Sequence, residues 1–120
     1  MDVQPVVAEP DPRVRVAGEG DGLLLLGVRC AGCGLAAVEP VLRCGACGGD
    51  TEPTSLRPNG NVWSWTVVGV GPDRGTAFAY VDLDDGPRVL VRLGEGTPRV
   101  VGTRVRVRGT TPDGDLEAGA

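Results

Sequence analysis

The feature that most constrains this chain is a pair of C-x2-C units, Cys30-Ala31-Gly32-Cys33 and Cys44-Gly45-Ala46-Cys47, separated by ten residues. A C-x2-C turn directs two sulfurs toward one tetrahedral metal ion while backbone N–H groups point at the thiolates. Glycine follows the second cysteine of each unit, at Gly34 and Gly48, where the backbone has to approach closely. The spacing therefore predicts two similar knuckles that hold one metal ion.

One structural Zn²⁺ is the metal that this set of ligands favours, held by Cys30, Cys33, Cys44 and Cys47. Four thiolates close the coordination shell, and the sequence has no His, which argues against a hydrolytic zinc centre. Two disulfides are one alternative, disfavoured by the close pairing of the cysteines and by the lack of a secretion signal. A rubredoxin-like iron centre for electron transfer is another. The aromatic shell of such a module is missing from the knuckles, because the aromatic residues are Trp63, Trp65, Phe78 and Tyr80.

The second half of the chain has the period-two alternation that is typical of β-strands. Alternating runs occupy residues 62–68, 88–93 and 104–108, and residues 77–83 form a further extended run. Asp84-Asp85-Gly86-Pro87 is a turn signal between two of these segments. With 20 Gly and 10 Pro, the composition argues against a helical bundle. Four strands of this length favour a small barrel, because a flat sheet would leave unpaired edges.

We therefore expect an all-β protein with an N-terminal ribbon over residues 13–55 and an antiparallel barrel over residues 56–112. Residues 1–12 are expected to form a flexible arm, and residues 113–120 a flexible tail. Since no fifth strand is evident after residue 109, the barrel is expected to be incompletely closed. No apolar run approaches the roughly 20 residues of a membrane-spanning helix, so we expect a cytoplasmic protein without membrane contact.

The net charge of −4 is unevenly distributed. Residues 88–108 contain six Arg and one acidic residue, Glu95, within an otherwise acidic chain. All 12 basic residues are Arg, which a bias toward Arg codons explains equally well. A basic segment on an acidic body can recognise an anionic ligand, but it is a poor general binder of nucleic acid.

The order of these motifs resembles a known family, the bacterial and archaeal acyl-CoA-associated proteins that join a rubredoxin-like zinc ribbon to an OB-fold. The resemblance rests first on residues 29–34, Pro40 and residues 44–48, followed by a Gly-bounded strand that contains Ser64 and Thr66. Residues 79–84 and 86–88 are similar to the second and third barrel strands of the family. Gly102 before residues 104–107 resembles the start of the fourth. The usual last strand, which ends in an aromatic residue and Pro, is not recognisable in residues 109–120.

This resemblance implies a function as an accessory subunit. It implies an OB-like barrel after the zinc ribbon, and a non-catalytic chain that binds and stabilises an acyl-CoA-processing enzyme. The partner would be a thiolase-like, aldolase-like or hydratase-like subunit. In some complexes of the family the OB-fold helps to enclose the CoA portion of the substrate, so contact with CoA is also an expectation.

Four aromatic residues are candidate ligand or partner contacts: Trp63, Trp65, Phe78 and Tyr80. Alternation places the two tryptophans on one face of their strand, which suits a stacking platform for single-stranded nucleic acid, a core, or a partner interface. The acidic chain without Lys favours the core or the partner. A nucleic-acid-binding ribbon and OB-fold protein is the alternative function, and an independent small enzyme or electron carrier is the third.

Arg104, Arg106 and Arg108 alternate along one expected strand. They are either the solvated face of that strand or an anion site for the phosphates of CoA or for an acidic partner. The carboxylates within residues 82–85 lie at a hairpin turn, where Asp favours local backbone bonding, so we interpret them as turn residues. Without His and with every Cys assigned to metal, the sequence has no nucleophile–base pair.

Overall fold

The structure is a computed structural model that describes residues 14–39 and 41–120. The arm expected over residues 1–12 lies outside the described residues. Among the described residues there is no helix with the length and apolar character that a membrane span needs. The elements are β1 (Val16–Ala17), the 3-10 turn η1 (Gly20–Gly22), β2 (Leu24–Cys30), β3 (Ala36–Ala37), β4 (Thr51–Leu56), β5 (Asn59–Val67), β6 (Ala77–Leu83), β7 (Arg88–Leu93), β8 (Arg104–Thr110) and β9 (Leu116–Gly119).

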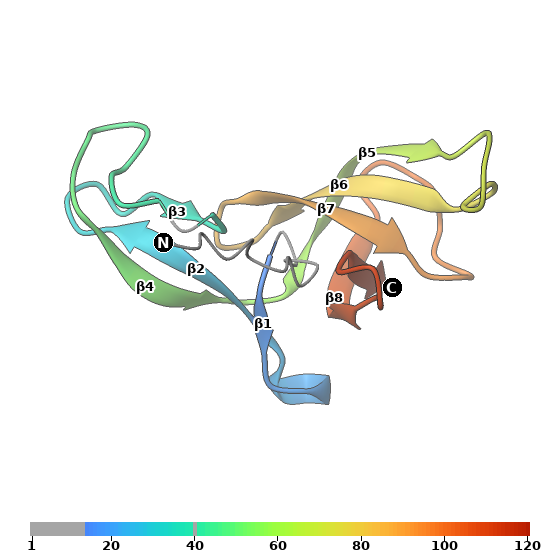
Figure 1. Cartoon of the computed structure of the whole chain (residues 1–120), viewed down its shortest axis with the longest axis horizontal. Coiled ribbons are helices and arrows are strands. Elements are labelled where there is room, and N and C mark those ends of the chain that lie inside the picture. The colour runs from blue at the N-terminus through green and yellow to red at the C-terminus, as the bar shows by residue number, and fades with distance from the viewer. Residues whose placement is uncertain (1–13, 40) are drawn as a thin grey trace, which may run out of the picture.

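The first four strands form an antiparallel sheet that positions the cysteine knuckles. One edge of β2 pairs with β4, from Leu25 opposite Leu56 to Cys30 opposite Thr51. The other edge of β2 pairs with β1 and β3. The first knuckle follows β2 directly, and the second lies between β3 and β4. Figure 1 shows this sheet at one end of the molecule, and the barrel strands at the other.

The remaining five strands form a closed barrel in the order β5-β6-β7-β9-β8, with β8 pairing back to β5. All neighbours are antiparallel except β7 and β9, which are parallel. A five-stranded barrel in this arrangement is an OB-fold. The predicted fold class, an all-β chain with a cysteine ribbon before an OB-like barrel, is confirmed.

The closing strand corrects the sequence analysis, which found no fifth strand and placed a flexible tail at residues 113–120. Strand β9 lies within that segment and pairs with β7 and β8. It escapes a periodicity search because only Leu116 and Ala118 point into the core, and Gly and Asp residues flank them. Its parallel partner Val91 is distant in sequence, so no local signal predicts the pairing.

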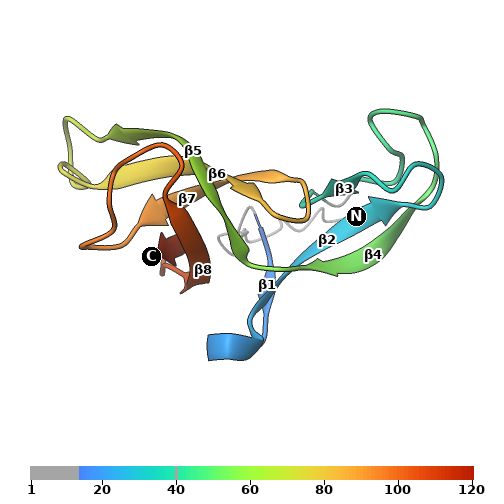
Figure 2. The same cartoon turned by 180° about the vertical axis from the view of Figure 1, so that it is seen from behind.

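A single apolar cluster joins the sheet to the barrel. Leu25 and Leu56 of the sheet are fully buried, and they belong to the same cluster as Val81, Val91 and Val107 of the barrel. Figure 2 shows from behind how β4 runs directly into β5 and so leads from one unit to the other. The ribbon and the barrel therefore share one hydrophobic core.

The connector between β4 and β5 is fixed to the barrel by polar contacts. The backbone N–H of Arg57 donates to Asp85 Oδ2 over 2.7 Å, and its guanidinium donates to Oδ1 over 2.9 Å. The carbonyl of Pro58 accepts from the N–H of Val107 at 2.8 Å. These bonds hold the end of the ribbon sheet against the β6–β7 hairpin and against β8.

Candidate functional site

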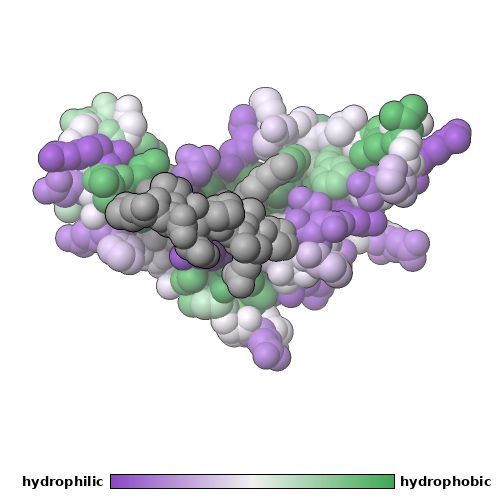
Figure 3. Space-filling view, viewed as in Figure 1, coloured by the Kyte–Doolittle hydropathy of each residue, from purple (hydrophilic) through white to green (hydrophobic). Residues whose placement is uncertain are grey.

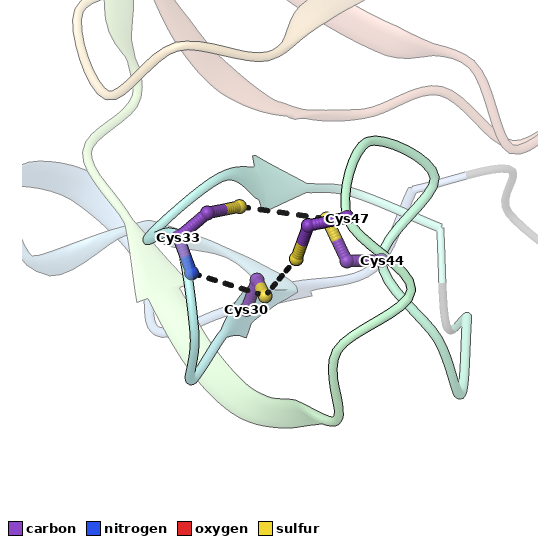
Figure 4. Close-up of side chains that lie close together, drawn as sticks. All are labelled: Cys30, Cys33, Cys44 and Cys47. Carbon is purple, nitrogen blue, oxygen red and sulfur yellow. Dashed lines mark hydrogen bonds between the residues drawn. The ribbon is translucent and has the colours of Figure 1, made fainter.

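The four cysteines come together at the end of the ribbon. Their Sγ atoms all lie within 4.8 Å of one another. Two pairs join the two knuckles, with Sγ–Sγ distances of 3.4 Å for Cys30 and Cys47 and 3.6 Å for Cys33 and Cys44 (Figure 4). These distances are far longer than the roughly 2.05 Å of a disulfide bond.

Both knuckles have the same backbone geometry. In the first, the N–H of Gly34 donates to the carbonyl of Cys30 at 3.0 Å, and in the second the N–H of Gly48 donates to the carbonyl of Cys44 at 2.9 Å. Gly34 and Gly48 have φ angles of +81° and +73°, which side chains other than glycine rarely adopt. The glycine after each second cysteine is thus required by the turn itself.

An arginine braces each knuckle. Arg29 donates to the carbonyl of Gly34 over 2.8 Å, and Arg43 donates to the carbonyl of Gly48 over 3.5 Å. Arg43 also forms an ion pair with Asp50. Each knuckle therefore has one guanidinium group bound to the carbonyl of the glycine that ends it.

Backbone N–H groups and neighbouring thiols shift the pKa values of the cysteine thiols in opposite directions. Hydrogen bonding from the N–H of Cys33, with a further bond from Cys47, lowers the pKa of the Cys30 thiol to about 6. Backbone N–H groups, first that of Cys47, also lower the pKa of Cys44. The N–H of Gly49 lowers the pKa of Cys47, but the adjacent Cys30 and Cys33 thiols outweigh it and raise that pKa to about 12. Four thiolates cannot coexist here without a cation to balance them.

This arrangement fits one tetrahedral metal ion. Metal–sulfur bonds of about 2.3 Å place the sulfurs roughly 3.8 Å apart, close to the observed distances. Four thiolates fill the coordination shell of such an ion, which leaves no position for a substrate. The cluster can hold a metal ion as a structural site.

The sequence analysis missed Gly49, which lies directly behind the sulfurs. A Cβ at this position would stand 3.1 Å from Cys30 Sγ and 3.2 Å from Cys47 Sγ. By contrast, a Cβ at Gly45 would meet nothing within 4 Å. The signal in the sequence was the Gly48-Gly49 pair, of which only the first residue was considered.

A β-bulge corrects the prediction that the two tryptophans share a face. The register between β5 and β6 shifts at Trp63, between Val62 and Ser64. Beyond the shift, Trp65 pairs with Ala79, whose side chain lies in the core. Since cross-strand partners point to the same face, Trp65 belongs to the inner face of the sheet. The extra residue in the bulge leaves Trp63 on the outer face, where its contacts lie.

Trp63 is the centre of a cluster on the outer barrel face, which we call the Trp63 cluster (Trp63, Tyr80, Asp82 and Arg88). The Trp63 and Tyr80 rings meet edge to face with their centroids 6.3 Å apart. The Arg88 guanidinium lies 3.5 Å from the Trp63 centroid and donates to Asp82 over 2.6 Å. Trp63 remains 50% exposed and Tyr80 45% exposed. The half-buried Phe78 lies further along β6, opposite Thr66.

The three arginines of β8 have separate partners. Arg104 donates to both carboxylate oxygens of Asp84 through its two terminal guanidinium nitrogens, and the distance from Nη1 to Oδ1 is 2.6 Å. Arg106 donates to the carbonyl of Gly20 at 3.1 Å and so ties η1 to the barrel, while Arg108 donates to the Ala120 oxygen at 2.7 Å. The three side chains therefore do not converge on one anion in this structure.

Each aspartate of the β6–β7 hairpin pairs with an arginine. The three pairs are Asp82–Arg88, Asp84–Arg104 and Asp85–Arg57. The guanidinium hydrogen bonds hold the pKa of all three carboxyls below their ordinary value of 3.8. Carboxylates that stay ionised and ion-paired at neutral pH are poor proton donors. Asp84 and Asp85 lie in the turn as expected, whereas Asp82 lies within β6, so its interpretation as a turn residue is wrong.

Further apolar side chains are exposed at the two ends of the molecule. Leu35 and Leu42 of the ribbon are 52% and 87% exposed, and Val67 and Val70 at the end of β5 are 37% and 80% exposed. Figure 3 shows apolar surface at both of these ends.

Comparisons with known proteins agree with this architecture. Residues 54–110 match the family model of the ChsH2 C-terminal OB-fold domain. A solved structure titled Ltp2-ChsH2(DUF35) aldolase is similar to the chain, with a TM-score of 0.65 and 25% sequence identity. The similarity covers 79% of this chain and 83% of that chain. No curated protein matches the chain.

Proposed function

We propose that this chain is an accessory subunit of an acyl-CoA-processing enzyme, on the basis that residues 54–110 match the family model of the ChsH2 C-terminal OB-fold domain. The observation behind the proposal is the similarity, over 79% of the chain, to a chain of the solved structure titled Ltp2-ChsH2(DUF35) aldolase. That title favours an aldolase-like partner over a thiolase-like one. Two further parts of the proposal are that the substrate is an acyl-CoA and that the barrel lies beside CoA. Both rest on the resemblance of the ribbon and barrel motifs to the acyl-CoA-associated family.

The proposed role is non-catalytic. The sequence has no His, and the four thiols face one another at a closed site. The carboxylates of the β6–β7 hairpin are all engaged by arginine. These groups are the ones from which acid–base or covalent catalysis of thioester chemistry is normally built, so we assign the chemistry to the partner.

The metal in the proposed ribbon of residues 13–55 is a single structural Zn²⁺ bound by Cys30, Cys33, Cys44 and Cys47. Support comes from the tetrahedral spacing of the sulfurs and from the lack of an open coordination position. Metal analysis of protein from its own cells should find one zinc per chain, and replacement of any of these cysteines by Ser should abolish binding. Visible iron–thiolate absorption would contradict the assignment.

We further propose that the Trp63 cluster contacts the partner enzyme. Trp, Tyr and Arg are the residues most enriched at energetically important interface positions. Asp82 and the Trp63 ring already hold Arg88 in place, so the side chain loses little conformational freedom on binding. A single-strand nucleic-acid platform is less well supported, because the bulge places Trp65 on the opposite face and Asp84 neutralises Arg104.

The decisive experiment compares acyl-CoA consumption by the chain alone, by the co-purifying partner alone and by their mixture. We expect turnover only where the partner is present, with higher activity and stability in the mixture. Activity of the chain alone would contradict the non-catalytic role. A partner equally active and stable without the chain would contradict the accessory role.

A further inference from the structure

Only the first half of β5 pairs on both of its edges. The residues up to Asn61, which lies opposite Arg104, pair with β8, and the last backbone bonds on that side join Val62 to the loop before β8. Residues 64–67 pair with β6. Among the strands that the structure describes, none pairs with their other edge, which we call the free edge. Figures 1 and 2 both show this half of β5 at the upper border of the barrel, with β6 below it.

The free edge presents backbone groups at every second residue. On the side of β6, the N–H of Val68 donates to the carbonyl of Thr76 at 2.9 Å. Because the bonds of an antiparallel ladder alternate along the strand, Thr66 also bonds toward β6, whereas the N–H and C=O groups of Trp65 and Val67 point to the free edge. A row of such unpaired groups is a template for a further strand.

The sequence places no charge along the free edge. Residues 59–72 contain no Asp, Glu, Lys or Arg. The contrast is β4, whose pairing partner among the described strands is β2, and which contains Glu52 and Pro53. Charged side chains and prolines are the usual means by which proteins protect an open edge from pairing. The bulge at Trp63 disturbs only the start of the free edge, so the residues from Ser64 onward can accept a new strand.

The side chains at the free edge are apolar and exposed. Trp65 and Val67 lie on the inner face of the sheet, and Trp65 is 43% exposed although its partner Ala79 is buried. Since β8 has already left β5 at this point, no barrel strand covers them from the free edge among the described residues. Further exposed apolar side chains border the two ends of the edge: Val70, Val100 and Val101.

We infer that the free edge of β5 pairs with the same edge of a second copy of this chain. An antiparallel arrangement with its two-fold axis at Thr66 places Trp65 opposite Val67 of the other copy. The outward N–H and C=O groups of these residues then bond to each other across the interface. Thr66 lies opposite Thr66 of the other copy, and such Thr–Thr pairs are favourable between strands.

A second copy matches the chemistry of the free edge along its whole length. No charged residue is brought into the interface from residues 59–72 of either copy. The same register carries Val70 toward Val62 of the other copy, where the loop with Val100 and Val101 lies, so that exposed apolar groups cover one another. A charged peptide would find no counter-charge within residues 59–72, which argues against it as the occupant. The inference does not rest on the proposed function.

Sedimentation of the full-length, metal-loaded chain at several concentrations tests the inference. We expect a monomer–dimer equilibrium for the wild type. Thr66→Glu should weaken dimerisation about tenfold or more, because two carboxylates then face each other at the two-fold axis. Thr66 is exposed, so the monomer should remain folded. Ser55→Glu adds the same charge at an exposed position of β4 and should leave the dimer within about twofold.

A charge-reversal experiment tests the position of the axis. Thr66→Lys should also disrupt the dimer, whereas an equimolar mixture of Thr66→Glu and Thr66→Lys should restore it, because opposite charges then meet. Hydrogen exchange provides a second measurement. The amides of Trp65 and Val67 should become protected as the concentration of the wild type rises.

Three outcomes would overturn the inference. The first is a chain that stays monomeric at every concentration up to the millimolar range. The second is a dimer that Thr66→Glu weakens no more than Ser55→Glu does, or a mixture of the two Thr66 variants that stays monomeric while circular dichroism shows both folded. The third is protection of the Trp65 and Val67 amides only after addition of the co-purifying enzyme, which would assign the edge to a strand of that partner.

Discussion

Glycine at two positions of the second knuckle has two different physical roles. Gly48 adopts a positive φ angle of +73°, whereas Gly49 leaves room for two sulfurs. The clustering of the four cysteines and the turn glycines after them could be predicted from the sequence, because a C-x2-C turn is a local structure with fixed spacing. The role of Gly49 could not, since it depends on Cys30 from the other knuckle.

Gly49→Ala should lower the affinity for Zn²⁺ about tenfold, as do many changes in the surroundings of metal ligands. The added methyl group would press on Cys30 Sγ and Cys47 Sγ without removing a ligand. Competition with a chromophoric chelator measures the change. Gly45→Ala is the matched control, because a Cβ there meets nothing within 4 Å. Equal affinities of the two variants would contradict the proposed crowding.

Asp85 links folding to pH through Arg57. Its hydrogen bonds with Arg57 hold its pKa below 3.8, so the pair stabilises the folded chain above that pH. This contribution is lost as the pH falls through the folded-state pKa. Asp85→Asn should therefore lower the thermal midpoint at neutral pH and have much less effect at about pH 2. The exposed Asp113, changed to Asn, is the control, and an equal loss at both pH values would argue against the ion pair.

At the level of strands, the sequence predicts those with period-two alternation, but it does not predict features that depend on pairing with distant strands. Strands β6, β7 and β8 were predicted, because their buried residues recur at every second position. Strand β9 was missed since it is short and its partners are distant. The bulge at Trp63 was also missed, because nothing in the residues 62–66 distinguishes a regular strand from one with an extra residue.

Gly60→Ala tests how tightly the barrel closes. Gly60 pairs with Leu83 on β6 and with Val105 on β8, and a Cβ there would overlap the carbonyl oxygen of Asp82 and stand 2.8 Å from Val81 Cγ1. Overpacking of this kind costs about 1–3 kcal/mol. Urea unfolding should show that loss for Gly60→Ala. Gly69→Ala, where space is open, should be neutral, and a neutral Gly60→Ala would contradict the close approach.

At the scale of the whole molecule, the shared core joins the sheet that carries the cysteine cluster to the barrel. Leu25 of β2 and Leu56 of β4 belong to the ribbon sheet. Both are fully buried, and they pack in the same apolar cluster as the barrel residues. Removal of the metal by a chelator should therefore lower the stability of the barrel as well. Fluorescence of Trp63 and Trp65 and metal release should follow one transition. A barrel that unfolds at the same urea concentration with and without metal would show two independent domains.

The outer barrel face is the surface that we propose for contact with the partner. Trp63 is half exposed, stacked on Arg88 and in contact with Tyr80, whereas Trp65 lies on the inner face with no ring contact to them among the described residues. Trp63→Ala should weaken association with the co-purifying enzyme by about 2 kcal/mol or more, which is typical of a central aromatic anchor. Trp65→Ala removes the same side chain from the other face and should change association much less. Both variants are compared by sedimentation with the wild-type partner, after thermal unfolding has established that each is folded at the working temperature. If Trp65→Ala weakens the complex and Trp63→Ala does not, the partner binds the opposite face of the barrel and the interface proposed here is wrong.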